Sequence, residues 1–172
     1  MSAQAIKKPL QTSNYFDLGE AHISPATGPC IPYRAGLINE LKKENRQILV
    51  WIKYLLHRIK EGDLKKSVQV LHDMHKLVLA HFLKENISLY VYIKSLHKKN
   101  PVTGLISEIR REMGCVQAML LMFFDAYLNR QLQQSDMRPM GKELYVLGKV
   151  LHRRIKRLES QLYPLYVPPR LI

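Results

Sequence analysis

The segment His-Phe-Leu-Lys-Glu-Asn-Ile-Ser-Leu-Tyr, residues 81–90, carries the strongest structural signal in the chain. His81 and Glu85 lie four residues apart, so on a helix they share one face. Apolar residues surround them on that face: Leu77, Val78, Phe82 and Leu89. The two polar residues are therefore either ligands of a buried metal, or a core histidine and a glutamate that another buried group satisfies.

The composition indicates one helical domain with an added arm. The chain has 172 residues, 47% hydrophobic content and only 8 glycines, which supports a real core and favours helix. Its longest apolar run, residues 118–124, is too short to span a bilayer, and the N-terminus lacks a signal-peptide pattern. Cys30 and Cys115 match no metal or redox motif, so we expect a reducing, cytoplasmic location.

Apolar residues at three-to-four spacing predict four long helices. We expect these helices over residues 35–61, 63–99, 101–134 and 139–163. Gly62 ends the first, Asp63 caps the second, and Asn100-Pro101 marks the next boundary. Long amphipathic helices joined by short turns predict an all-α, antiparallel up-down-up-down four-helix bundle.

The helical pattern covers only part of the chain. Residues 1–33 contain four prolines and no sustained period, which predicts an irregular N-terminal arm. The bundle is expected over residues 34–166 and a short tail over residues 167–172.

Unusual residues interrupt the apolar seam near the middle of each predicted helix: Asn45, His81, Glu85, Met113 and Arg154. In an antiparallel bundle the middles of the helices meet at one level. We predict that Arg154 pairs with Glu85, because the guanidinium suits a carboxylate and a lone buried charge is costly. His81 and Asn45 would complete the hydrogen bonds. The alternative is that Arg154 turns outward to solvent.

The order of these motifs resembles the hemerythrin HHE cation-binding family. That family has a Glu-His pair in one helix, then His-x-x-x-Glu followed by Leu-Tyr/Phe-Pro, and then the same two elements again. The corresponding elements here are Glu44-Asn45-Arg46, His81 to Glu85 with Leu89-Tyr90, Glu112-Met113, and Arg154 to Glu159 with Leu162-Tyr163-Pro164. The resemblance covers residues 35–166 and implies a hemerythrin-like bundle.

The resemblance also implies a di-iron centre, but this chain keeps ligand chemistry only at His81 and Glu85. The other ligand positions carry Asn45, Met113, Arg154 and Leu158. Two ligands do not make a stable iron or zinc site, and an arginine places a cation where a metal would bind. We predict that the metal site is lost and that no cofactor is bound. If a metal is bound after all, His81 and Glu85 are its expected ligands.

A weaker resemblance is to the regulator-of-sigma-D anti-sigma family. That family has a His-Phe-x-x-x-Glu element and a later arginine-containing helix, which His81-Phe82 and Arg154 resemble. Its members bind a sigma factor through protein surface and need no metal. This resemblance implies that a metal-free bundle can act by binding.

His72 and His75, with Asp73 between them, form the remaining histidine group that could bind a metal, together with His81. We expect them instead to be solvated or half-buried. No spacing links a nucleophile to a base, so we expect no enzymatic activity.

The net charge of +13 indicates an acidic partner. We expect a basic surface on the third and fourth helices: Arg110, Arg111, Lys142, Lys149, Arg153, Lys156 and Arg157. The predicted function is a non-enzymatic binding or regulatory module for an acidic protein surface or assembly. Nonspecific, salt-sensitive binding of nucleic acid is an alternative use of the same charge. The alternative function class is a metal-binding oxygen or redox sensor. The sequence carries no signal for an oligomeric state.

Overall fold

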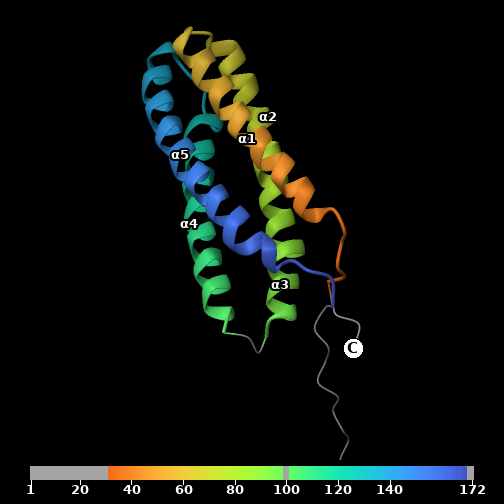
Figure 1. Cartoon of the computed structure of the whole chain (residues 1–172). Coiled ribbons are helices and arrows are strands. Elements are labelled where there is room, and N and C mark those ends of the chain that lie inside the picture. Colours follow the sequence, from red (N-terminus) through yellow and green to blue (C-terminus); the bar gives the residue numbers. More distant parts are fainter. Residues whose placement is uncertain (1–30, 99–100, 170–172) are drawn as a thin grey trace, which may run out of the picture.

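The computed structural model describes residues 31–98 and 101–169, which form an antiparallel bundle of long helices (Figure 1). The α-helices are α1 (Leu37–Lys60), α2 (Leu64–Lys84), α3 (Val91–Leu96), α4 (Thr103–Leu128) and α5 (Met137–Arg157). A π-helical segment, Glu85–Tyr90, joins α2 to α3, and a second one, Leu158–Leu162, continues α5 into a 3-10 turn, Tyr163–Leu165. The described residues contain no strand, so the predicted all-α four-helix bundle is confirmed.

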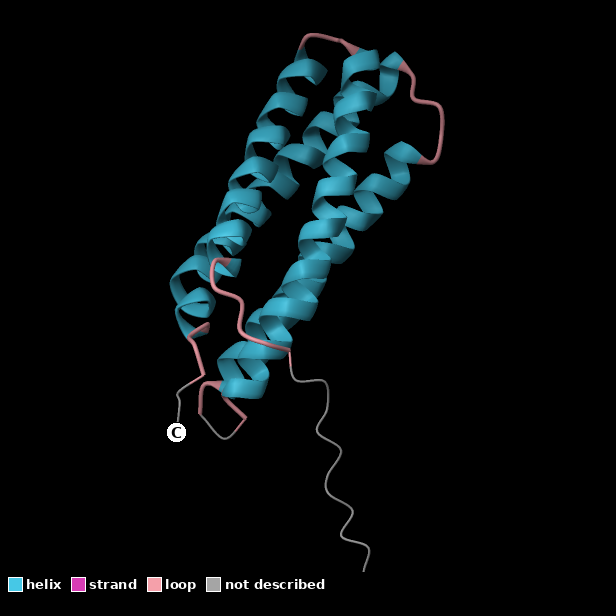
Figure 2. Cartoon of the chain, turned by 90° about the vertical axis from the view of Figure 1, so that its right-hand side faces the viewer, coloured by secondary structure: helices cyan, strands magenta, loops and turns pink. Residues whose placement is uncertain are grey.

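Each long helix packs against two neighbours, which closes the bundle around one core. α1 packs against α2 and α5, and α4 packs against the same two helices from the other side. The helices run alternately up and down, as Figures 1 and 2 show. The buried apolar residues recur at the heptad spacing of a bundle core, for example Leu41, Ile48 and Leu55 in α1 and Leu144, Leu151 and Leu158 in and after α5. None of the described helices is both long enough and apolar enough to cross a bilayer.

The boundary between α1 and α2 lies where the sequence predicts it. Gly62 adopts a left-handed conformation with φ of 74°, which a glycine accepts without steric cost. The side chain of Asp63 accepts a hydrogen bond of 3.1 Å from the backbone N–H of Lys66 and so caps α2.

The predicted end of the third helix at residue 134 is wrong, because α4 ends at Leu128. The chain turns after this point, and Leu132 beyond the helix is buried in the core. Arg130 binds Asp136 with two hydrogen bonds of 2.9 and 2.8 Å. Asp136 also accepts a hydrogen bond of 2.7 Å from the backbone N–H of Gln133. These polar contacts stabilise the connection to α5.

The fourth helix begins at Met137, two residues before the predicted start at Pro139. Proline is tolerated there, because N–H groups in the first helical turn have no acceptor within the helix. The predicted second helix over residues 63–99 also needs correction. It contains a π-helical segment, and α3 ends at Leu96.

The arm of residues 1–33 is described only from residue 31, and the tail of residues 167–172 only to residue 169; the other residues of both predicted segments lie outside the described part. The described ends of the chain pack together. The ring of Tyr33 stacks on that of Tyr166 at 5.1 Å, and the Tyr92 hydroxyl donates a 2.7 Å hydrogen bond to the carbonyl of Val167.

α1 and α5 approach each other closely at two glycines. A Cβ atom at Gly141 would lie 3.0 Å from Ile59 Cγ2, and one at Gly148 would lie 3.1 Å from Ile52 Cγ2. The two glycines are seven residues apart, so they lie on the same face of α5. The contact between these helices is therefore tight at both positions, and a side chain there would force Ile59 or Ile52 to shift.

Replacing Gly148 by leucine should lower the free energy of unfolding by about 1–3 kcal/mol, because the added side chain overpacks the α1–α5 contact. Urea unfolding followed by circular dichroism measures this change. Gly114→Leu is the matched control, since a Cβ atom at Gly114 meets nothing within 4 Å. That variant should be neutral or stabilising, because leucine favours helix more than glycine does. Equal losses in both variants would contradict the close approach.

Candidate functional site

A buried ion pair lies in the core of the bundle. Glu85 is fully buried and Arg154 is 6% exposed. The Arg154 Nη2 atom lies 2.8 Å from Glu85 Oε2. Arg154 therefore points into the bundle and not outward to solvent.

Tyr163 links this pair to Asn45. The Tyr163 hydroxyl donates a 3.3 Å hydrogen bond to Glu85 Oε1 and accepts one of 2.9 Å from Asn45 Nδ2. The buried amide of Asn45 thus reaches Glu85 through the tyrosine, where the sequence suggested a more direct contact. We call Asn45, His81, Glu85, Arg154 and Tyr163 the polar core layer.

His81 connects the polar core layer to the surface. Its Nε2 atom lies 3.4 Å from Glu85 Oε1, and its Nδ1 atom lies 2.9 Å from Glu44 Oε2. Glu44, in turn, accepts a hydrogen bond from the Lys84 ammonium group. A chain of polar contacts thus runs from the buried pair to the partly exposed Glu44 and Lys84 on α1 and α2.

The electrostatics keep Glu85 ionised. Burial alone would raise the pKa of this carboxyl, but the charge of Arg154 and the contacts of His81 outweigh burial and lower the pKa. Burial likewise disfavours the charged form of His81, yet Glu85 and then Glu44 raise its pKa above the ordinary value of 6.5. Burial and the charge of Glu85 raise the pKa of Tyr163, so its hydroxyl remains a neutral donor.

Both π-helical segments begin next to the polar core layer. Glu85 is the first residue of one, and the other begins four residues after Arg154 and ends before Tyr163. A π-helical turn adds a residue and so changes the helical phase. Leu89 and Tyr90 are both buried at the end of the first segment, and so are Leu162 and Tyr163 at the end of the second. This change of phase helps to direct the Tyr163 hydroxyl to Glu85.

Sequence reasoning missed the roles of Tyr163, Glu44 and Lys84. Tyr163 lies in a Leu-Tyr-Pro element, which is the only local signal for it. Glu44 and Lys84 are half-exposed residues on polar faces, and their partners are on another helix. No helical period predicts such a contact between helices.

The described residues do not fit a di-iron centre. Among them no group of three or more His, Cys, Asp or Glu side chains could hold a metal ion. The carboxylate oxygens of Glu85 contact Arg154, Tyr163 and His81, and His81 Nδ1 contacts Glu44. At the other positions where the family carries ligands, Met113 and Leu158 are buried apolar side chains. Hard metal ions require more oxygen and nitrogen ligands than this layer offers.

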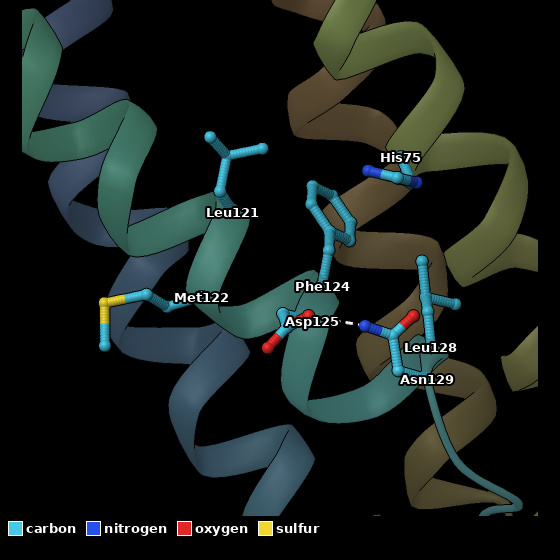
Figure 3. Close-up of a pocket in the computed structure, with 7 residues that line it drawn as sticks. All are labelled: His75, Leu121, Met122, Phe124, Asp125, Leu128 and Asn129. Carbon is cyan, nitrogen blue, oxygen red and sulfur yellow. Dashed lines mark hydrogen bonds between the residues drawn. The ribbon is translucent and has the colours of Figure 1, made fainter.

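The second histidine group is not brought together either. His75 of α2 faces Phe124 of α4, with ring centroids 4.7 Å apart, and both residues line one hollow (Figure 3). His72 is exposed, and His81 points to the glutamates described above. The alternative metal site built from His72, His75 and His81 does not form in the described part of the chain.

The predicted basic surface divides into distinct parts. Arg110 and Arg111 are exposed on α4, and Lys142, Lys149, Arg153 and Lys156 are exposed on α5. Arg157 departs from the prediction, because it pairs with Glu108 at 2.9 Å and also binds Glu112. Its charge is balanced within the chain.

Replacing Glu85 by alanine should lower the free energy of unfolding by about 3–5 kcal/mol, because Arg154 is left as a buried unpaired charge. Glu108→Ala is the control, since it breaks an exposed ion pair with Arg157 and should cost less than about 1 kcal/mol. Urea unfolding measures both changes. A loss under about 1 kcal/mol for Glu85→Ala would contradict a buried charge pair.

The double variant Glu85→Leu with Arg154→Met distinguishes two causes of the stability loss in Glu85→Ala: the unpaired charge of Arg154 and the lost packing of the Glu85 side chain. Because both charges are removed together, it should recover most of the stability that Glu85→Ala loses. A double variant as unstable as the single one would show that packing, and not the unpaired charge, causes the loss.

The stability of the protein should fall as the pH rises above about 6.5, because the raised pKa of His81 means that the folded state binds more protons there. Stability should also fall on acidification below about 4.5, because Glu85 and Glu44 have lowered pKa values. Unfolding free energies across this range test both slopes. His81→Gln should remove the neutral-to-alkaline slope, whereas His152→Gln, at an exposed position on α5, should leave it unchanged.

Comparison with known proteins agrees with this architecture. The family model of the hemerythrin HHE cation binding domain matches residues 32–166. No curated protein and no solved structure gives a significant match. Since the matched region covers most of the chain, the protein belongs to the hemerythrin HHE cation-binding domain family.

Proposed function

We propose that this protein is a non-enzymatic binding or regulatory module in which an ion-paired polar layer replaces the di-iron centre of its family. We further propose that it engages an acidic macromolecular partner through its basic surfaces. The chain has only two cysteines, Cys30 and Cys115, and they match no metal or redox motif, which favours a reducing, cytoplasmic setting.

The observation that carries the proposal is the contact between Arg154 and Glu85. A guanidinium offers only hydrogen-bond donors, so it cannot coordinate a cation. At 2.8 Å from Glu85, it supplies the positive charge that a metal would otherwise supply to this carboxylate. The pair therefore satisfies the buried carboxylate without a metal.

Burial of the polar layer also favours a non-enzymatic role. Glu85 is fully buried, and His81 and Asn45 are each 1% exposed. A substrate would need access to these groups, and they line none of the five hollows at which lining residues are defined in the described part of the chain. The layer is suited to holding the bundle together, and the exposed charge is suited to binding.

A metal-binding oxygen or redox sensor is the second candidate. His81 and Glu85 retain ligand chemistry, and Glu44 lies 2.9 Å from His81 Nδ1. These groups favour the candidate only if the pair with Arg154 opens to admit a metal.

Metal analysis of the protein, expressed in iron-supplemented medium, should find far less than one iron per chain, and its near-ultraviolet and visible spectrum should lack iron bands. The matched control restores ligand chemistry at four positions at once: Asn45→His, Met113→His, Arg154→His and Leu158→Glu. If the folded control retains iron and the wild type does not, these four replacements account for the difference. Near-stoichiometric iron in the wild type that is lost in His81→Gln would overturn the proposal and favour the sensor.

A further inference from the structure

A groove made of adjoining hollows lies along the seam between α1 and α5. These two helices lie side by side (Figure 1). The groove consists of two hollows, with volumes of about 700 Å³ and 570 Å³, that share Leu56 and Tyr145. Along α5 the lining residues extend from Arg138 to Lys156, a distance of about 27 Å for a helix.

The floor of the groove is apolar and includes two glycines. Gly148 lines the first hollow and Gly141 the second, so α5 presents no side chain at either place. Leu49, Ile52 and Ile59 of α1 supply apolar surface beneath. The glycines are seven residues apart, so the hollows repeat after two helical turns, about 10.5 Å.

The rim of the groove is strongly cationic. Lys53, Lys149, Arg153 and Lys156 line the first hollow, and Lys60, Arg138 and Lys142 line the second. No Asp or Glu is among the lining residues, and within the described chain none of these seven cations has an acidic partner. By contrast, the hollow between α4 and α5 is lined by both Lys142 and Glu143, so its rim carries positive and negative charge.

We propose that the α1–α5 groove binds an acidic amphipathic helix of a partner protein. Apolar residues of such a helix, spaced two turns apart, would occupy the two hollows, and its flanking carboxylates would meet the cations on both rims. This inference rests on the proposed binding function and names its surface and the chemistry of its partner.

The observations favour this occupant over others. A phosphate backbone needs cations but makes no use of an apolar floor with a two-turn repeat. A second copy of the chain carries the same net charge of +13, which opposes its docking on a cationic rim. The length of the groove matches a helix of about 18 residues.

A fluorescein-labelled synthetic peptide tests the proposal. The probe is a helix of about 18 residues with leucines at heptad spacing and glutamates on both flanks. Fluorescence anisotropy with the full-length protein should show binding that weakens with salt. A peptide with serine in place of leucine should bind at least about tenfold more weakly, and so should one with the leucines scrambled out of register.

Two double variants with the same change in net charge locate the binding site. Lys53→Glu with Arg153→Glu reverses one charge on each rim and should weaken binding of the acidic peptide about tenfold or more. Lys76→Glu with Lys94→Glu makes the same change at exposed residues of α2 and α3 that do not line the groove, and should have little effect. Equal losses in the two variants would overturn the groove as the site.

Binding of other anionic partners tests whether the occupant of the groove is a helix. A DNA duplex, or vesicles rich in phosphatidylserine, should bind more weakly than the peptide and should not discriminate between the two double variants. Groove-dependent binding of either one, without binding of the peptide, would overturn the proposed occupant. These results are independent of the metal analysis, because iron in the core would overturn the proposed function and leave the charge on the groove unchanged.

Discussion

The contact between Glu85 and Arg154 is the interaction around which the core of this bundle is organised. Both groups are charged in a region from which water is excluded, where each alone would be very costly. Their contact, with the hydroxyl of Tyr163 and the imidazole of His81 on the remaining carboxylate oxygen, satisfies much of that charge. A metal ion would neutralise carboxylates in a similar way, which is why the layer can be understood as a protein-only substitute.

The layer also joins elements that are distant in the sequence. Asn45 comes from α1, His81 and Glu85 from α2 and its π-helical continuation, and Arg154 and Tyr163 from α5 and its continuation. Hydrogen bonds are directional, so they specify one register of these helices more strictly than apolar contacts do. The aliphatic residues above and below the polar core layer account for most of the buried apolar surface. The polar core layer determines how the helices align with one another.

The surface has a separate organisation. Glycines at two positions of α5 allow it to approach α1, and hollows lie along the seam between the two helices. The cations that line these hollows form no ion pair within the described chain. Other parts of the charge are balanced internally, as Arg157 is by Glu108 and Glu112. The positive charge is therefore not spread evenly over the surface. Some basic residues are neutralised by ion pairs, and the unpaired ones gather in particular places, such as the groove.

Much of this protein was predictable from local pattern. The three-to-four periodicity predicted the helices, Gly62 and Asp63 marked a boundary correctly, and the polar interruptions at Asn45, His81, Glu85 and Arg154 identified residues that prove to be buried. Such features depend on residues within one or two helical turns of each other, so they can be inferred from the local sequence. The early end of α4, the π-helical turns, and the contacts of Tyr163, Glu44 and Lys84 were not predictable in this way. They depend on which side chains meet across the bundle, and that becomes defined only when helices far apart in the sequence pack together.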